Sequence, residues 1–136
     1  MHQLVIIDAD KDVRKILDMV THEEGYHSTL FLTGDTAVGY LRQLSHGTIV
    51  LFEHSPLTMQ RYQSLLWYLL DADATLRQQH AYVLMTTNAL NIPTHHLLQT
   101  LQMPLLYKPF ALADLLLALH QAAQHLTDAE HSYASC

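Results

Sequence analysis

The chain has 136 residues, and its hydrophobic fraction of 49% is large enough for one globular domain and too large for a disordered segment. It carries 13 acidic residues against 7 Lys and Arg, and the net charge of −6 argues against direct binding to nucleic acid. No apolar run approaches the roughly 20 residues of a membrane span. We therefore expect a soluble protein with no membrane segment.

Apolar runs alternate with segments of helical periodicity along the chain. Short runs rich in β-branched residues predict strands at 4–7, 26–32, 48–52, 81–85 and 105–107. Apolar residues at helical spacing predict helices at 11–24, around 37–44, 65–70, 88–101 and 112–126. The segment 71–79 is expected to be a polar connection, and 127–136 a polar, mobile C-terminal tail.

Regular alternation of buried strands with helices predicts an α/β fold. Right-handed crossovers place helices on both faces of a parallel sheet. The prediction is a doubly wound five-stranded parallel sheet with five helices, a three-layer sandwich. We expect one domain over residues 1–126 and no output domain after it. Cys136 is the single cysteine, so no internal disulfide forms, and residues 1–25 lack a signal-peptide layout, which favours a cytoplasmic location.

Polar residues stand at four of the five predicted strand ends, where doubly wound folds collect their functional groups. They are Asp8 and Asp10, then Glu53, then Thr86 and Thr87, and finally Lys108 with Pro109. Carboxylate oxygens bind hard cations such as Mg²⁺, and hydroxyl and ammonium groups stabilise phosphoryl oxygens. This set suggests a site for a cation and an anionic group.

The order and sequence context of these residues resemble the receiver domain of bacterial two-component response regulators. The resemblance covers residues 2–125 and is carried by four segments, at 6–14, 50–53, 86–87 and 107–110. It implies a flavodoxin-like, receiver-type fold in which an aspartate at the end of the third strand accepts a phosphoryl group. It also implies phosphorelay signalling, with a histidine kinase or another signalling protein as partner.

Two positions depart from the acidic pattern of that family. The family has two adjacent acids after the first strand, whereas Ala9 follows Asp8 here, and the missing carboxylate is the one that usually binds magnesium. The phosphoacceptor position aligns with Glu53, whose carboxylate reaches about 1–1.5 Å further than that of an aspartate, while in-line transfer tolerates little misplacement. We therefore expect no ordinary aspartyl phosphorylation.

The switch residues of the family are also altered. Thr86 aligns with its hydroxyl residue and Lys108 with its lysine, but Thr87 replaces a smaller Ala or Gly. The family's aromatic switch residue is replaced by Leu105. Tyr107 lies two residues later, and we expect it on the opposite side of the strand.

Several hypotheses for this pocket follow. In one, Lys108 forms a fixed ion pair with Glu53 that locks the domain, or mimics an active state, without phosphate; in another, the pocket is inert. A third is residual chemistry in which Asp8, Asp10 and Glu53 bind Mg²⁺ and a non-standard acid accepts phosphate. A small ligand beside Ala9 is a further alternative. We expect no enzymatic activity, and no cofactor except Mg²⁺ under the third hypothesis.

The chain contains 11 histidines, which we interpret as solvated surface residues. Metal sites need converging ligands, whereas His120 and His125 point about 140° apart around a helix. We therefore expect no histidine metal site. His54, which follows Glu53, is expected at the rim of the pocket.

The last predicted helix is rich in leucine and poor in charge. A core stripe is expected from Leu112, Leu115, Leu116, Leu119 and Leu126. Leu117 extends this stripe, and Asp114 is the one charged residue from 111 to 126, so the helix also offers a candidate partner surface. Receiver domains commonly use their last two helices for contacts, so the resemblance implies a homodimer or another protein partner there. The resulting prediction is an atypical single-domain receiver that acts through protein–protein interaction.

Overall fold

Five parallel strands form one sheet in a computed structural model that describes residues 2–54, 65–70, 74–87 and 89–134, with the backbone alone described at 67, 70, 74 and 127–134. The strands are β1 (His2–Ile7), β2 (Tyr26–Phe31), β3 (Ile49–Glu53), β4 (Ala81–Thr86) and β5 (Leu105–Tyr107). Their order in the sheet is β2-β1-β3-β4-β5, so strand order reverses between β1 and β3.

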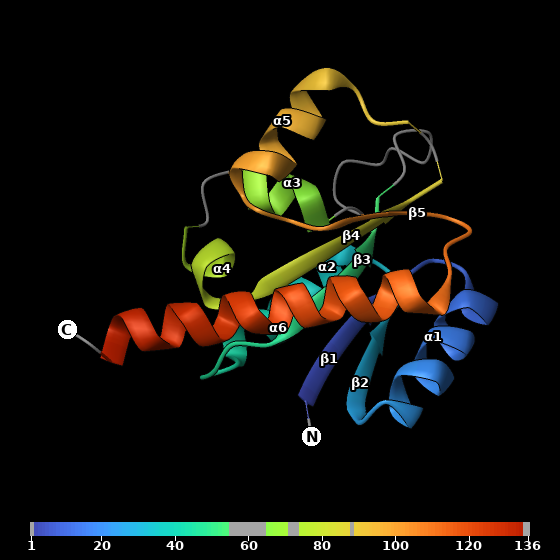
Figure 1. Ribbon diagram of the computed structural model, residues 1–136, viewed down its shortest axis with the longest axis horizontal. Coiled ribbons are helices and arrows are strands. Elements are labelled where there is room, and N and C mark those ends of the chain that lie inside the picture. The colour runs from blue at the N-terminus through green and yellow to red at the C-terminus, as the bar shows by residue number, and fades with distance from the viewer. Residues whose placement is uncertain (1, 55–64, 71–73, 88, 135–136) are drawn as a thin grey trace.

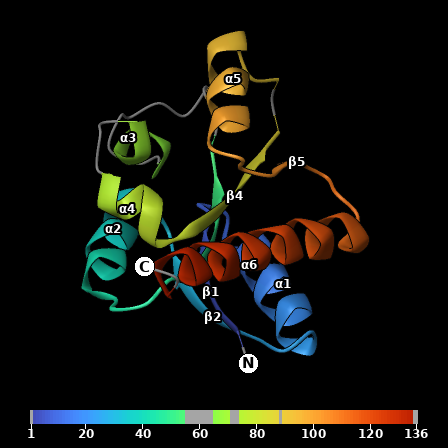
Figure 2. The same cartoon turned by 60° about the vertical axis from the view of Figure 1, so that its left-hand side comes forward.

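Helices cover both faces of this sheet (Figures 1 and 2). They are α1 (Lys11–Glu23), α2 (Gly34–Gln43), α3 (Leu65–Leu70), α4 (Ala74–Gln79), α5 (Ile92–Thr100) and α6 (Leu112–Ala134). Buried residues of α1 and α6 pack on one face, and those of α2, α3, α4 and α5 pack on the other. The predicted doubly wound three-layer sandwich is confirmed. None of the described helices could span a membrane, since none is both long and apolar enough.

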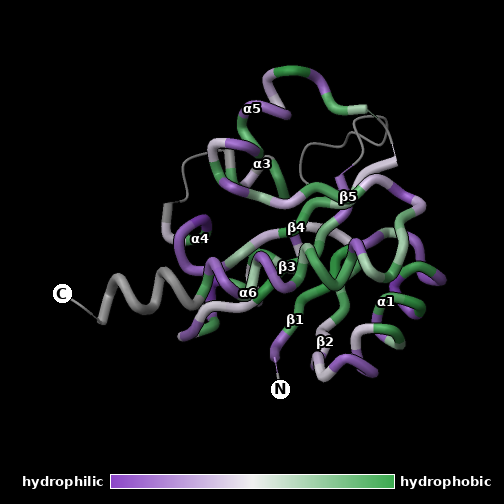
Figure 3. The backbone as a smooth tube through the Cα atoms, in the orientation of Figure 1, coloured by the Kyte–Doolittle hydropathy of each residue, from purple (hydrophilic) through white to green (hydrophobic). Residues whose placement is uncertain are grey.

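The strands have continuous apolar sequences because both of their faces are buried. Along β1, Val5 and Ile7 join the core cluster on the α2 and α3 side, whereas Leu4 and Ile6 join the cluster on the α1 and α6 side. Figure 3 shows this hydrophobic centre flanked by more hydrophilic helix ends. Each fully buried Leu or Ile side chain contributes about 1.5–3 kcal/mol to folding.

Helix α5 begins later than the predicted residue 88. Asn91 has an extended backbone, and its Oδ1 accepts a hydrogen bond of 2.9 Å from the N–H of Thr94. Asn91 therefore caps the helix, and Pro93 lies in the first turn, where a missing N–H has no cost.

Two predictions for polar segments are wrong. The segment 71–79 contains helix α4, whose Leu76 is buried in the core and accepts at its carbonyl a hydrogen bond of 2.6 Å from the Tyr82 hydroxyl. The last helix continues past Leu126 to Ala134 and projects beyond the sheet in Figure 1. No Gly or Pro occurs from 112 to 134, so the sequence contains no residue that strongly opposes a helix there.

The interpretation of all histidines as surface residues is wrong for His80, which is 1% exposed. The backbone N–H of Thr48 donates to its Nδ1 at 3.1 Å, and its Nε2 lies 3.2 Å from the carbonyl oxygen of Leu41. Because Nδ1 accepts, Nε2 must carry the proton and donate to Leu41, which requires the neutral ring. Burial, the largest cause, lowers the pKa of His80 in agreement with that form.

Candidate functional site

Neighbouring strands end together at one edge of the sheet and bring the predicted site residues together. The parallel register aligns Ile7 with Phe52, and Thr86 with Tyr107. The residues at these strand ends therefore share the carboxyl edge, next to the point where strand order reverses. They include Asp8, Ala9, Glu53, Thr86 and Lys108.

Asp8 and Lys108 form a short ion pair. Lys108 Nζ lies 2.5 Å from Asp8 Oδ2, and Asp8 is 1% exposed. The second carboxylate oxygen, Oδ1, accepts a hydrogen bond of 2.9 Å from the backbone N–H of Asp10. Both oxygens of the buried carboxylate thus have a donor, which is the condition under which a buried charge is tolerated.

Glu53 lies further from the same ammonium. Its Oε1 is 3.6 Å from Lys108 Nζ, and its Oε2 accepts a long hydrogen bond of 3.4 Å from the backbone N–H of Ala9. The predicted pair of Lys108 with Glu53 is therefore present as the longer of two contacts, and Asp8 is the nearer partner. The carboxylate of Asp8 is fully buried, whereas the Glu53 side chain is 25% exposed. Because attraction strengthens as water is excluded, the deeper acid holds the cation.

The surroundings of Glu53 favour its protonated form. Burial raises the pKa of this carboxyl, and the charge of Asp8 and a hydrogen bond between the two carboxyls raise it further. The Lys108 ammonium and the Ala9 N–H act in the opposite direction. The net shift of the pKa is upward because burial and the neighbouring Asp8 outweigh the Lys108 ammonium and the Ala9 N–H.

Asp10 does not join this group. Its Oδ1 accepts hydrogen bonds from the backbone N–H groups of Asp12 at 2.9 Å and Val13 at 3.3 Å, so it is the N-cap of α1. The Mg²⁺ ligand set of Asp8, Asp10 and Glu53 is therefore not assembled. Within the described residues, no group of three or more His, Cys, Asp or Glu side chains is placed to hold a metal ion.

The two threonines after β4 have different environments. Thr86 is fully buried, and its carbonyl accepts a hydrogen bond of 2.8 Å from the backbone N–H of Lys108. This bond holds the lysine backbone beside the acidic residues. Thr87 is exposed, and so is Pro109, which follows the lysine.

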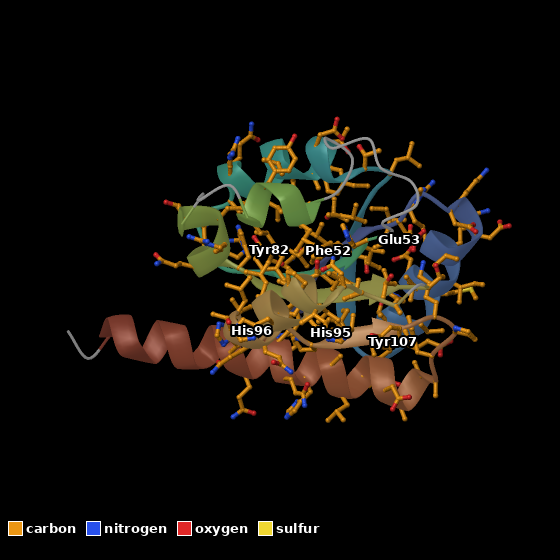
Figure 4. All side chains as sticks on the ribbon, turned by 90° about the horizontal axis from the view of Figure 1, so that it is seen from above. Phe52, Glu53, Tyr82, His95, His96 and Tyr107 are labelled. Carbon is orange, nitrogen blue, oxygen red and sulfur yellow. The ribbon has the colours of Figure 1, made fainter. Side chains whose placement is uncertain are left out.

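Tyr107 lies on the same face of β5 as Leu105, and the prediction of opposite faces is wrong. Residues two apart on a strand share a face, and Leu106 between them packs on the α6 side. The Tyr107 hydroxyl lies 3.1 Å from Nε2 of His95 in α5 (Figure 4). Sequence reasoning missed His95, because this contact depends on how α5 packs beside β5.

The environment of His54 differs from the sequence interpretation, and Arg14 makes a contact that was not predicted. His54 is not at a solvated rim but only 6% exposed, and burial lowers its pKa. Its backbone N–H donates to the carbonyl of Met85 at 2.8 Å, which extends the pairing of β3 with β4. Arg14, which the sequence analysis left without a role, donates from Nη1 to the carbonyl of Asp8 at 2.6 Å and ties α1 to the end of β1.

Comparisons with known proteins give a match at the level of structure. No family model and no curated protein matches this chain. A CheY-like response regulator receiver domain protein from Methanospirillum hungatei JF-1 superposes with a TM-score of 0.69 at 20% identity, covering 96% of this chain and 98% of that chain. A sensor protein from Polaromonas sp. JS666 gives a TM-score of 0.70 at 20% identity, with 92% and 98% covered. The beryllofluoride-activated NtrC4 receiver domain dimer gives 0.70 at 16% identity, with 92% and 99% covered.

This chain has the receiver-domain fold. In this receiver fold, α5, β5 and α6 form an exposed surface, the α5–β5–α6 face. A groove of about 440 Å³ beside β5 and α6 is lined in part by Tyr107 and Leu117, and a second of about 440 Å³ beside α5 and β5 is lined in part by His95 and Gln102. Leu117 is 57% exposed, as expected for a surface residue. Leu112 is 46% exposed, so its predicted place in the core is wrong: it is the first residue of α6.

Proposed function

We propose that this chain is an atypical receiver module of two-component signal transduction. It acts by binding other proteins in the cytoplasm and does not undergo ordinary aspartyl phosphorylation. The observation that carries the proposal is the placement of one ammonium, that of Lys108, against both acids of the site at 2.5 Å and 3.6 Å. The receiver-domain fold supports the signalling role.

The charge balance of the site supports a state that needs no phosphate. Asp8 and Glu53 are the two acids that contact Lys108, and Ala9 supplies a backbone N–H where the family has a second adjacent acid. A divalent cation prefers several oxygen ligands, and two carboxylates that already share an ammonium are a poor set. The Lys108 ammonium thus offsets one of the two carboxylate charges from within the chain.

The position of Glu53 supports the absence of ordinary transfer. Its Oε2 is engaged by the Ala9 N–H, and its raised pKa lowers the fraction of ionised nucleophile. Phosphoryl transfer depends on an in-line approach of an ionised oxygen, and small misplacements are costly. Glu53 is therefore a structural partner of Lys108 in this proposal.

The α5–β5–α6 face supports output through protein contact. From residue 87 to 126 the formal charges are those of Lys108 and Asp114, in a chain with a net charge of −6. A weakly charged face with an exposed leucine is the part of the surface where desolvation costs least. A second copy of the chain, or a histidine kinase or other signalling protein, is the proposed occupant.

The proposal is tested with acetyl phosphate and Mg²⁺, followed by intact mass measurement, and with beryllofluoride followed by NMR. We expect no mass gain of one phosphoryl group and no Mg²⁺-dependent shifts at Glu53, Thr86 and Lys108. A matched variant, Ala9→Asp with Glu53→Asp, restores the acids of the family pattern and is expected to respond to Mg²⁺. A phosphoryl gain in the wild-type chain that Glu53→Gln removes would overturn the proposal and make the chain an atypical phosphoacceptor.

A further inference from the structure

A small cavity lies at the amino ends of β4 and β5, at the opposite edge of the sheet from the acidic site. Its volume is about 40 Å³, and its walls come from α4, β4, α6 and the connection before β5. Figures 1 and 2 show α4 beside the C-terminal half of α6 in this region. A single water needs about 10–15 Å³, so the space suits a few waters or one small anion.

Arg77 of α4 supplies a permanent positive charge to this cavity. Its side chain is half-buried, and its Nη1 donates to the carbonyl of Leu69 at 3.4 Å. The described lining residues include no Asp or Glu. A guanidinium has five N–H donors in a fork that matches an oxyanion, so this one weak bond leaves most of its capacity for a ligand.

Two further donors border the same space. Gln102 follows α5 with a φ of 54°, and this left-handed turn places it between α5 and β5. His125 of α6 also lines the cavity. His80 also lines the cavity, but both of its ring nitrogens are hydrogen-bonded to the backbone of Thr48 and Leu41. It therefore contributes an uncharged surface to the cavity.

We propose that this cavity binds a small inorganic oxyanion of the phosphate class. Arg77 is the charged partner, and the Gln102 amide and the His125 imidazole are the additional donors. Among the described lining residues, the permanent charge is the positive charge of Arg77. Because the net charge of the chain is −6, the attraction of an anion comes from this cavity and not from the chain as a whole. Gln102 also lines the groove beside α5 and β5, which places the bound anion directly behind the α5–β5–α6 face.

The test is a titration of the isotope-labelled chain with inorganic phosphate, followed by heteronuclear NMR, with sodium chloride at equal ionic strength as reference. We expect saturable shifts at Arg77, Gln102 and Ala81 that chloride does not produce. Arg77→Gln should weaken binding about tenfold or more, because it removes a charged donor. Lys15→Gln removes one exposed charge on the distant α1 and should leave the affinity unchanged.

The outcomes distinguish phosphate binding in this cavity from phosphate binding at the acidic site on the other edge of the sheet. Equal affinity in the wild type and Arg77→Gln, shifts confined to Thr86 and Lys108, or equal shifts with chloride would each overturn the proposal. If Arg77→Gln does not fold, His125→Gln and Gln102→Ala replace it, and unchanged affinity in both would overturn it as well. None of these results bears on phosphorylation of Glu53, so the two proposals fail independently.

Discussion

At Lys108, one ammonium serves two carboxylates of unequal burial. Asp8 is almost inaccessible and takes the contact of 2.5 Å, while Glu53 remains 3.6 Å away. Because Coulomb attraction grows as water is excluded, the Asp8 pair is the stronger of the two. A change at Lys108 is therefore felt first at Asp8, and Glu53 is the acid whose ionisation the fold resists.

Lys108→Met removes the cation and leaves the Asp8 carboxylate buried. We expect the free energy of unfolding at neutral pH to fall by about 3 kcal/mol, because an uncompensated buried charge is costly. Adding Asp8→Asn should recover part of this loss. Urea unfolding of the single and double variants measures both effects, and Lys15→Met on the exposed side of α1 should stay within about 0.5 kcal/mol of the wild type. Equal losses in the single and double variants would show that the pair is unimportant.

Glu53→Gln tests the raised pKa of Glu53 through the pH dependence of stability. In the folded state the pKa lies above the ordinary value of 4.5, so the folded chain binds more protons than the unfolded chain between these values. The free energy of unfolding therefore falls as the pH rises from 4.5 through the folded pKa, and the loss remains above it. Glutamine resembles the protonated acid and does not titrate. The free energy of unfolding of the variant should therefore rise relative to that of the wild type as the pH increases across this window.

The measurement for Glu53→Gln is urea unfolding at a series of pH values from about 4.5 to 8. Glu23→Gln, on the exposed side of α1, is the matched control. Its difference from the wild type in free energy of unfolding should not change with pH. If the difference in free energy of unfolding between Glu53→Gln and the wild type is also independent of pH, then burial and Asp8 do not oppose the ionisation of Glu53.

Among the elements, the end of α2, the start of β3 and the start of β4 meet at the side chain of His80. The ring accepts from the N–H of Thr48 and donates to the carbonyl of Leu41. The buried Thr48 N–H has the imidazole as its partner, whereas the Leu41 carbonyl also accepts from the backbone N–H of Leu44 at 3.3 Å. One neutral imidazole thus satisfies the Thr48 N–H and gives the Leu41 carbonyl a second donor.

His80→Ala should lower the free energy of unfolding by about 1–3 kcal/mol, since the buried Thr48 N–H loses its partner and the Leu41 carbonyl loses one of two donors. The pKa of His80 is lowered below 6.5 in the folded state, so the unfolded chain binds more protons as the pH falls through that window. Acidification below 6.5 therefore removes part of the contribution of His80, and the gap between variant and wild type should narrow. Thermal and urea unfolding at neutral and mildly acidic pH measure this gap. His120→Ala, exposed on α6, should leave stability within about 0.5 kcal/mol, and a similar small effect for His80→Ala would refute the bridging role.

For the whole molecule, the distribution of charge separates two kinds of surface. The acidic residues lie mainly before residue 74, and the α5–β5–α6 face belongs to a stretch with few charges. Two copies that meet through this face place their charged surfaces apart, which suits a two-fold contact in which the same residues face one another.

Leu117→Glu should weaken self-association of the chain by about tenfold or more, because a two-fold contact brings two new carboxylates together. Sedimentation equilibrium over a range of protein concentrations gives the association constant. Ile16→Glu on α1 is the control, because Ile16 is 56% exposed and Leu117 is 57% exposed. Equal association constants in the two variants would place the contact elsewhere, and a wild-type chain that stays monomeric would rule out the homodimer.

Local patterns predicted most of the elements correctly. The run Leu105–Tyr107 coincides with β5, and the helix predicted at 11–24 matches α1 (Lys11–Glu23) to within one residue, because strand and helix periodicity and the stop at Gly25 are visible in the chain. Asn91 and Leu126 show where local patterns are insufficient. The cap at Asn91 makes α5 begin later than its apolar residues predict. The predicted end of α6 at Leu126 is too early, because the polar sequence that follows still permits a helix.

The sequence by itself determined the order of strands and helices, the doubly wound sheet and the set of side chains at its carboxyl edge, because buried strands and amphipathic helices leave a periodic record along the chain. Only the tertiary structure decided which acid holds Lys108, that Asp10 caps α1, that His80 is buried, and that Tyr107 meets His95. Each of these depends on distances and burial between segments far apart in the chain. Electrostatic attraction and desolvation act through space, so residue spacing carries no record of them.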